Sequence, residues 1–225
     1  MAPPITVANW MRAPRISKNC SPGLEYLTTI DLLLMHQKIE LGEVLTGFET
    51  CNKYAIFNSL GQQLYDVEEE TDFCTRLCFG SSRSFKMRIL DNSRKVVMRL
   101  NRPFAWCLAR LEVLFPNDTV IGSVQENCTL CVPSFSVNNP AGVTVAKIEG
   151  PMCTFSCCGD VKFKVMSADG SRQIGEINKQ WSGLMQELFT DADNFGIKFP
   201  LDLDVNTKAT LLGACILIDM IYFED

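Results

Sequence analysis

Four aspartates near the C-terminus have a spacing that could bind a divalent cation. They lie within fourteen residues of one another: Asp191, Asp193, Asp202 and Asp204. A calcium-binding EF-hand loop takes oxygen ligands from positions 1, 3, 5, 7, 9 and 12 and has glycine at position 6. Counted from Asp191, the third position is Asp193, the twelfth is Asp202 and the sixth is Gly196. The spacing therefore predicts a Ca²⁺ site with Asp191, Asp193 and Asp202 as ligands.

Two positions of this spacing supply no side-chain oxygen. Phe195 stands at position 5 and Phe199 at position 9, whereas Ile197 at position 7 could still bind through its carbonyl. Water or other carbonyls would have to complete the ligand shell, so we expect weak affinity, on the order of 10⁻⁴–10⁻³ M. The alternative is a solvated acidic segment whose negative charge favours the start of the following helix.

Eleven cysteines offer a second kind of chemistry. The N-terminal residues Met1–Pro4 lack the features of a signal peptide, so we expect reduced thiols rather than a disulfide framework. Cys107 lies in the apolar run Phe104–Leu108, next to Trp106. Tryptophan favours membrane interfaces, and a cysteine in such a loop can be S-acylated reversibly. The sequence therefore predicts Cys107 as a palmitoylation site.

Zinc binding is an alternative role for other cysteines. One Cys-x-x-Cys pair is present, with three further thiols downstream: Cys128, Cys131, Cys153, Cys157 and Cys158. Structural zinc sites usually use two such pairs or add histidine, and His36 is the only histidine. Small buried or loop thiols are the simpler interpretation. The single histidine also argues against Cys-His or Ser-His catalysis.

The elements that must position these residues are mostly strands. Runs rich in β-formers, each pair joined by a turn signal, predict five hairpins: Tyr54–Val67, Phe85–Leu100, Leu111–Val124, Ser134–Ile148 and Val161–Ile177. A further segment, Ile30–Leu41, could be a strand or a helix. This gives about ten to twelve antiparallel strands. A meander of that length can close into a barrel, and the lumen of such a barrel has to be filled.

The C-terminal segment 208–223 is the apolar helix that could fill it. From Ala209 to Phe223, only Thr210 and Asp219 are clearly polar. Fifteen helical residues span roughly 22 Å, less than the ~30 Å hydrocarbon core of a bilayer. Apolar residues on every face require either a protein interior or a short membrane anchor. The residues that would be buried or in the membrane are Leu211, Leu212, Ile216, Leu217 and Ile218.

Bulk composition fits one folded domain. The chain has 225 residues, of which 47% are hydrophobic and 21% charged, an ordinary globular balance. We expect residues 1–22, which include four prolines, to form a mobile tail and residues 23–225 to form one domain. The formal charge of −5 argues against binding to nucleic acid.

Three runs closely resemble the phospholipid scramblase family: Asn19–Leu27, Cys157–Val161, and Asp191–Asp204 followed by Gly213-Ala214-Cys215. The resemblance extends over nearly the whole chain, from about Asn19 to Glu224. It implies a Tubby-like fold, a twelve-stranded barrel around a C-terminal helix. It also implies Ca²⁺-dependent, ATP-independent, bidirectional movement of membrane phospholipids, without covalent chemistry, at the cytoplasmic face of the plasma membrane.

The resemblance also places functional segments. The family's calcium segment corresponds to Asp191–Asp202 and its proposed membrane helix to Ala209–Phe223. The dense cysteine cluster that is palmitoylated in relatives is reduced to Cys107, and one acyl chain gives only reversible membrane binding. The family's long proline-rich N-terminal region for SH3 or WW partners is replaced by the short tail. Gly175–Leu184 is less basic than the family's nuclear-import segment, which argues against import.

Two functions from different classes remain open. The first is a calcium-responsive lipid translocator attached to a membrane by its C-terminal helix or peripherally. The second is a Tubby-like regulatory module that binds lipids or signalling proteins without transport activity, with its helix permanently buried. The two differ in where Ala209–Phe223 resides, because a helix that fills a barrel cannot also cross a bilayer without large unfolding.

Overall fold

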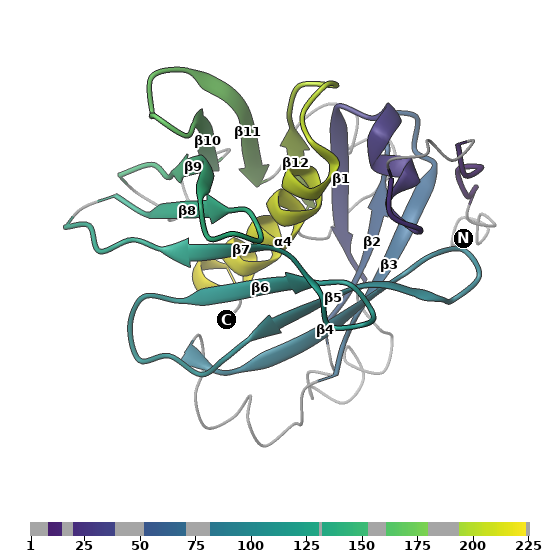
Figure 1. The fold of residues 1–225 in the computed structure, drawn as a ribbon, viewed down its shortest axis with the longest axis horizontal. Coiled ribbons are helices and arrows are strands. Elements are labelled where there is room, and N and C mark those ends of the chain that lie inside the picture. The colour runs from purple at the N-terminus through teal and green to yellow at the C-terminus, as the bar shows by residue number, and fades with distance from the viewer. Residues whose placement is uncertain are drawn as a thin grey trace, which may run out of the picture.

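The computed structural model describes residues 9–14, 20–38, 52–70, 82–130, 132–152, 161–179 and 194–223. These residues form twelve antiparallel strands, a short 3-10 helix η1 (Glu25–Thr29) and one long helix α4 (Val205–Tyr222). Figure 1 shows α4 running through the space that the strands surround. The strands are β1 (Leu32–Gln37), β2 (Lys53–Phe57), β3 (Gln63–Glu69), β4 (Phe85–Leu90), β5 (Val96–Arg102), β6 (Arg110–Leu114), β7 (Val120–Glu126), β8 (Ser134–Asn138), β9 (Thr144–Glu149), β10 (Val161–Ser167), β11 (Gln173–Lys179) and β12 (Asn194–Lys198).

The barrel is an up-and-down meander closed by its first and last strands. Every strand from β2 to β12 pairs with its sequence neighbours, and β1 pairs with both β2 and β12. At the closing seam, Leu33 lies opposite Ile197 and His36 lies opposite Asn194. The predicted closed antiparallel barrel of about twelve strands around an apolar C-terminal helix is confirmed. Closure gives each of the twelve described strands a partner on both sides, which removes the aggregation risk of an open sheet.

The five predicted hairpins are present with boundaries shifted by no more than a few residues. In β10 the pattern alternates as the sequence predicted: Phe163 and Val165 are buried, whereas Lys162 and Lys164 are exposed. The ambiguous segment Ile30–Leu41 contains a strand, β1. Strand β12 was not predicted, because its residues lie inside the stretch interpreted as a cation-binding loop.

Part of the expected N-terminal tail is attached to the barrel. The backbone N–H of Met11 donates a hydrogen bond to the carbonyl of Gln63. The backbone N–H of Gln63 in turn donates to the carbonyl of Asn9, and both bonds are 2.9 Å long. Trp10 forms an isolated parallel bridge with Gln63. Residues 9–11 thus pair with Gln63 at the start of β3, and the mobility of the tail over residues 1–22 stays a prediction. Residues 1–8 and 15–19 lie outside the described part.

The two ends of the barrel differ, and we name them by their connections. At the turn end, five hairpin turns join successive strands through residues 58–62, 91–95, 115–119, 139–143 and 168–172, and α4 begins. At the loop end, longer connections include residues 103–109, 127–133 and 150–160, and α4 ends. In Figure 1, β5 and β7 point toward the side where the yellow end of α4 lies.

Candidate functional site

Helix α4 is the core of the barrel. Asp204 caps its N-terminus by accepting hydrogen bonds from the backbone N–H of Thr207 at 2.9 Å and from its hydroxyl at 3.2 Å. The helix therefore starts three residues before the predicted Lys208. All five residues expected to be buried or in a membrane are fully buried here: Leu211, Leu212, Ile216, Leu217 and Ile218. Among the described residues, α4 is the one helix long and apolar enough to cross a membrane, and 78% of that span is buried.

Two glycines let α4 lie directly against β6 and β7. A Cβ at Gly213 would lie 2.8 Å from Cγ2 of Val113 in β6. A Cβ at Gly122 in β7 would lie 2.8 Å from the carbonyl oxygen of Asn138 and would also meet the hydroxyl of Thr210. Separations this short force the neighbouring atoms to move. The two glycines therefore set how closely helix and barrel wall approach.

Lys208 ties the start of α4 to the turn end. It is fully buried, and its Nζ donates to the carbonyls of Leu27 at 3.0 Å, Ile30 at 2.8 Å and Leu201 at 2.7 Å. Burial lowers the pKa of Lys208, whereas the negative charges of Asp31 and Asp202 raise it. A cation in the first turn opposes the helix dipole. The three carbonyls offset that cost and join α4 to the segment around η1.

The other end of α4 also carries buried polar contacts. The Tyr54 hydroxyl donates to Oδ2 of Asp219 at 2.8 Å, and both side chains are buried. Close by, Arg83 and Glu69 form a buried ion pair, and an Arg83 nitrogen lies 3.9 Å from the sulfur of Met220. Removing one partner of such a buried ion pair leaves the other charge without compensation, so these contacts favour the buried position of this end of the helix.

Part of the predicted calcium segment is a strand of the barrel rather than a loop. Asp191 and Asp193 lie outside the described residues, and Asp202 is exposed at the turn end. Between them, β12 is an extended strand paired with β1 and β11 rather than the middle of a loop. At its other end, the ring of Phe195 lies 5.7 Å from that of Phe223, at the end of α4. Calcium binding by the three aspartates stays a prediction.

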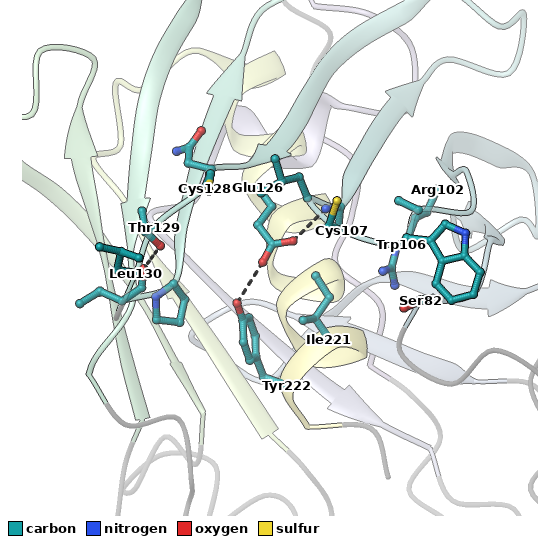
Figure 2. Close-up of a pocket in the computed structure, with 16 residues that line it drawn as sticks. Ser82, Arg102, Trp106, Cys107, Glu126, Cys128, Thr129, Leu130, Ile221 and Tyr222 are labelled. Atoms are coloured by element: carbon teal, nitrogen blue, oxygen red, sulfur yellow. Dashed lines mark hydrogen bonds between the residues drawn. The ribbon is translucent and has the colours of Figure 1, made fainter.

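Cys107 is exposed at the loop end and lines a recess of about 460 Å³. Figure 2 shows Cys107 and Trp106 on one side of this recess, Cys128 and Leu130 on the other, and Tyr222 of α4 between them. Exposure is what an acylation site requires, and acylation itself stays a prediction. Of the cysteines in the alternative zinc site, only Cys128 is described. No cluster of three potential metal ligands occurs among the described residues.

Glu126 connects the elements around the recess. Its carboxylate accepts a hydrogen bond from the backbone N–H of Ala109 at 2.8 Å and another from the Tyr222 hydroxyl at 3.4 Å (Figure 2). The pKa of Tyr222 is raised to about 12, mainly by burial and to a smaller extent by the negative charge of Glu126. Sequence reasoning found neither Lys208 nor this recess, because both depend on contacts between residues far apart in the chain. The exposed Trp106 beside Cys107 was the one available signal.

Together these features define a class of protein: a closed twelve-stranded barrel whose C-terminal helix is its core. A family model described as Scramblase matches residues 11–225. Phospholipid scramblase 2 of Bos taurus is 52% identical over 226 residues, covering 97% of this chain and 77% of that protein. Phospholipid scramblase 1 of Homo sapiens is 51% identical over 222 residues, covering 96% and 70%. The chain belongs to the scramblase family, as the resemblance predicted.

One solved structure aligns with this chain at low similarity. It is the X-ray structure of a protein from Arabidopsis thaliana, with a TM-score of 0.48 and 12% sequence identity. The alignment covers 85% of this chain and 94% of that one.

Proposed function

We propose that this protein moves phospholipids between the two leaflets of a membrane, in both directions and without ATP. The observation that carries the proposal is the identity of about half of all residues, over nearly the whole chain, to proteins named phospholipid scramblases. Such transport breaks no covalent bond, so it needs a path for the headgroup rather than a nucleophile. The proposed location is the cytoplasmic face of the plasma membrane.

Calcium is the proposed trigger, through Asp191, Asp193 and Asp202. Since β12 separates Asp202 from the other two, we propose that Asp191 and Asp193 act together and that Asp202 acts apart from them. Asp202 already lies close enough to Lys208 to influence its charge. Comparing Asp191→Asn/Asp193→Asn with Asp202→Asn tests this division, because each substitution removes charge while nearly preserving shape.

Reversible S-acylation of Cys107 is the proposed attachment to the membrane. The thiol is exposed beside Trp106, and a single acyl chain gives marginal, reversible binding. Labelling with a palmitate analogue should fall strongly in Cys107→Ser. Equal labelling and equal membrane fractionation of the two proteins would contradict the assignment.

Liposomes that contain the purified protein and a fluorescent lipid provide the direct test. We expect a quencher that cannot cross the membrane to quench inner-leaflet lipid faster when Ca²⁺ is present, because that lipid moves to the outer leaflet. No acceleration over protein-free vesicles, with Ca²⁺ and without, would overturn transport by this chain alone.

A second candidate function has its own support. The largely buried α4, held by Lys208 at one end and Asp219 at the other, fits a regulatory module that binds membrane lipid without moving it. Tight vesicle binding in the absence of lipid movement in the liposome assay would favour this module.

A further inference from the structure

The loop end exposes a group of large apolar side chains that come from three successive connections. We call it the apolar loop surface: Phe104, Trp106 and Leu108 after β5, Leu130 after β7, and Met152 after β9. Three of these side chains are almost wholly in water, with exposed fractions of 84% for Trp106, 102% for Leu130 and 84% for Met152. The turn end also exposes Leu60, Val143 and Leu201, but Trp106, Leu108, Leu130 and Met152 at the loop end line two adjoining hollows. Single exposed apolar residues are ordinary, whereas a contiguous group of them indicates a binding surface.

The apolar loop surface is continuous. Thr129 and Val132 line both the recess of Figure 2 and a neighbouring hollow of about 550 Å³. Trp106 and Leu130 belong to the recess, and Met152 belongs to the neighbouring hollow. The three connections therefore present one surface around the end of α4.

The chemistry of this surface suits a bilayer interface. Phe104 and Trp106 pack edge to face, with ring centroids 5.3 Å apart, and tryptophan is enriched where hydrocarbon meets headgroups. Two exposed lysines of β10, Lys162 and Lys164, line the same hollow as Met152, together with Glu149, which lies opposite Lys164 and leaves one net positive charge. Lysines at a membrane surface are attracted to anionic lipids. The overall charge of −5 repels such lipids, so this local basic pair has to act beside the apolar contacts.

We infer that the apolar loop surface inserts into the headgroup region of a phospholipid bilayer, with Lys162 and Lys164 against anionic headgroups. The choice of a bilayer as the partner rests on the proposed function. In this orientation the barrel stands on the membrane with the end of α4 toward it, and α4 stays inside the barrel. The recess then opens onto the lipid, and the exposed Cys107 thiol faces it.

Vesicle binding tests the inference with a matched control from the opposite end of the barrel. We expect Trp106→Ser/Leu130→Ser/Met152→Ser to weaken binding to phosphatidylcholine–phosphatidylserine vesicles by about tenfold or more, since three apolar contacts are lost. The turn end also exposes large apolar residues, and Leu60→Ser/Val143→Ser/Leu201→Ser should bind like the unsubstituted chain. The unsubstituted chain should bind phosphatidylcholine–phosphatidylserine vesicles more tightly than vesicles of phosphatidylcholine alone. Lys162→Gln/Lys164→Gln should lose this preference and bind the two kinds of vesicle equally.

Fluorescence locates the contact. In a Trp10→Phe/Trp181→Phe background, Trp106 is the only tryptophan. Its emission should shift to shorter wavelength when vesicles are added, because the ring leaves water. Three results would overturn the inference. The Trp106 emission could stay unchanged, the loop-end triple variant could bind vesicles as tightly as the unsubstituted chain, or both triple variants could lose the same amount of binding. Failure of the unsubstituted chain to bind vesicles would overturn it as well.

The same assay separates this inference from the proposed function. Binding is measured without any movement of lipid. A chain that binds through the apolar loop surface and moves no lipid overturns the proposed function and leaves the inference intact. A chain that moves lipid equally well with and without the loop-end substitutions, and binds equally well, overturns the inference alone.

Discussion

At the turn end of the barrel, each of the five hairpins is joined by five residues, whereas the six connections at the loop end run from seven to fifteen. Each tight turn begins near an Asn or Asp whose side-chain oxygen accepts a backbone N–H two residues on: Asn58, Asp91, Asn117, Asn139 and Asp169. These side chains replace the backbone partners that a sharp turn removes. At Asp169, hydrogen bonds from Ser167 and Ser171 lower the pKa to about 2.

The loop end exposes side chains of other types. Its described connections expose aromatic, aliphatic and thiol side chains, and the recess beside the end of α4 lies among them. The difference lies in the exposed side chains: those of the tight turns stabilise the turns, whereas those of the loop-end connections form the surface that we propose binds lipid. Substitutions at the two ends should therefore change different measurable quantities.

The largest effect on stability is expected from Lys208→Met, which keeps the length of the side chain and removes its three hydrogen bonds. The carbonyls of Leu27, Ile30 and Leu201 would lose a charged donor inside the protein, so we expect a loss of roughly 3 kcal/mol in the free energy of unfolding. Urea denaturation measures it. Lys198→Met, at an exposed position in β12, is the control and should change the free energy by less than about 0.5 kcal/mol. Similar losses for both lysines would show that the three hydrogen bonds of Lys208 do not stabilise the turn end.

Overpacking between α4 and the barrel wall should have the next largest effect. Gly213→Val places branched carbon atoms where even a Cβ lies 2.8 Å from Val113, so we expect destabilisation of about 1–3 kcal/mol. Adding Val113→Ala should recover part of this loss, because the two side chains compete for one space. Strictly additive effects in the double variant would show that α4 does not press on β6.

A smaller, pH-dependent effect is expected at the closing seam. Burial lowers the pKa of His36, while its hydrogen bond to Asn194, 2.7 Å long, raises it and Lys38 lowers it. The unfolded chain therefore binds the proton more readily, and stability should fall as the pH drops below about 6.5, the ordinary histidine value. His36→Gln should remove this part of the pH dependence. Thermal unfolding between about pH 5.5 and 7.5, where His36 is the one histidine that titrates, compares the two proteins. Identical pH profiles would contradict the assignment.

The smallest effect on stability is expected from the exposed apolar side chains of the loop end. Trp106→Ser/Leu130→Ser/Met152→Ser alters side chains that are almost fully exposed, so each should change the free energy of unfolding by less than about 0.5 kcal/mol. The same triple variant is the one expected to lose vesicle binding. A large loss of stability on urea denaturation would mean that the apolar loop surface belongs to the core instead.

The hairpins could be predicted because alternation and turn residues are local signals. Lys162 to Val165 alternate between water and core, and Asp169-Gly170 marks the turn that follows. Strand β12 could not be predicted in the same way, since Phe195, Gly196 and Ile197 are all buried and show no alternation. Its flanking aspartates gave a stronger pattern than its own residues.

Strand β1 was ambiguous for a related reason. Leu33 and Met35 belong to the main core, whereas Leu34 packs on the other side with Ala55 and Phe57. A strand buried on both faces has the same continuous apolar sequence as a segment of buried helix, so periodicity does not distinguish the two. The site was less predictable than the fold: Cys107 and Trp106 were visible in the sequence, but the carbonyls around Lys208 come from residues up to 181 positions away.

In the proposed membrane-bound orientation α4 stays in the barrel, and a reversible disulfide between α4 and β6 tests this. A Cβ at position 213 lies 2.8 Å from Cγ2 of Val113, so Val113→Cys/Gly213→Cys can form a disulfide between α4 and β6. The background carries Cys215→Ala, and that single variant undergoes the same treatment as a control. Vesicle binding and lipid movement are then measured for the oxidised and reduced forms. We predict equal values for both forms; loss of binding or transport on oxidation, with recovery on reduction, would show that α4 has to leave the barrel.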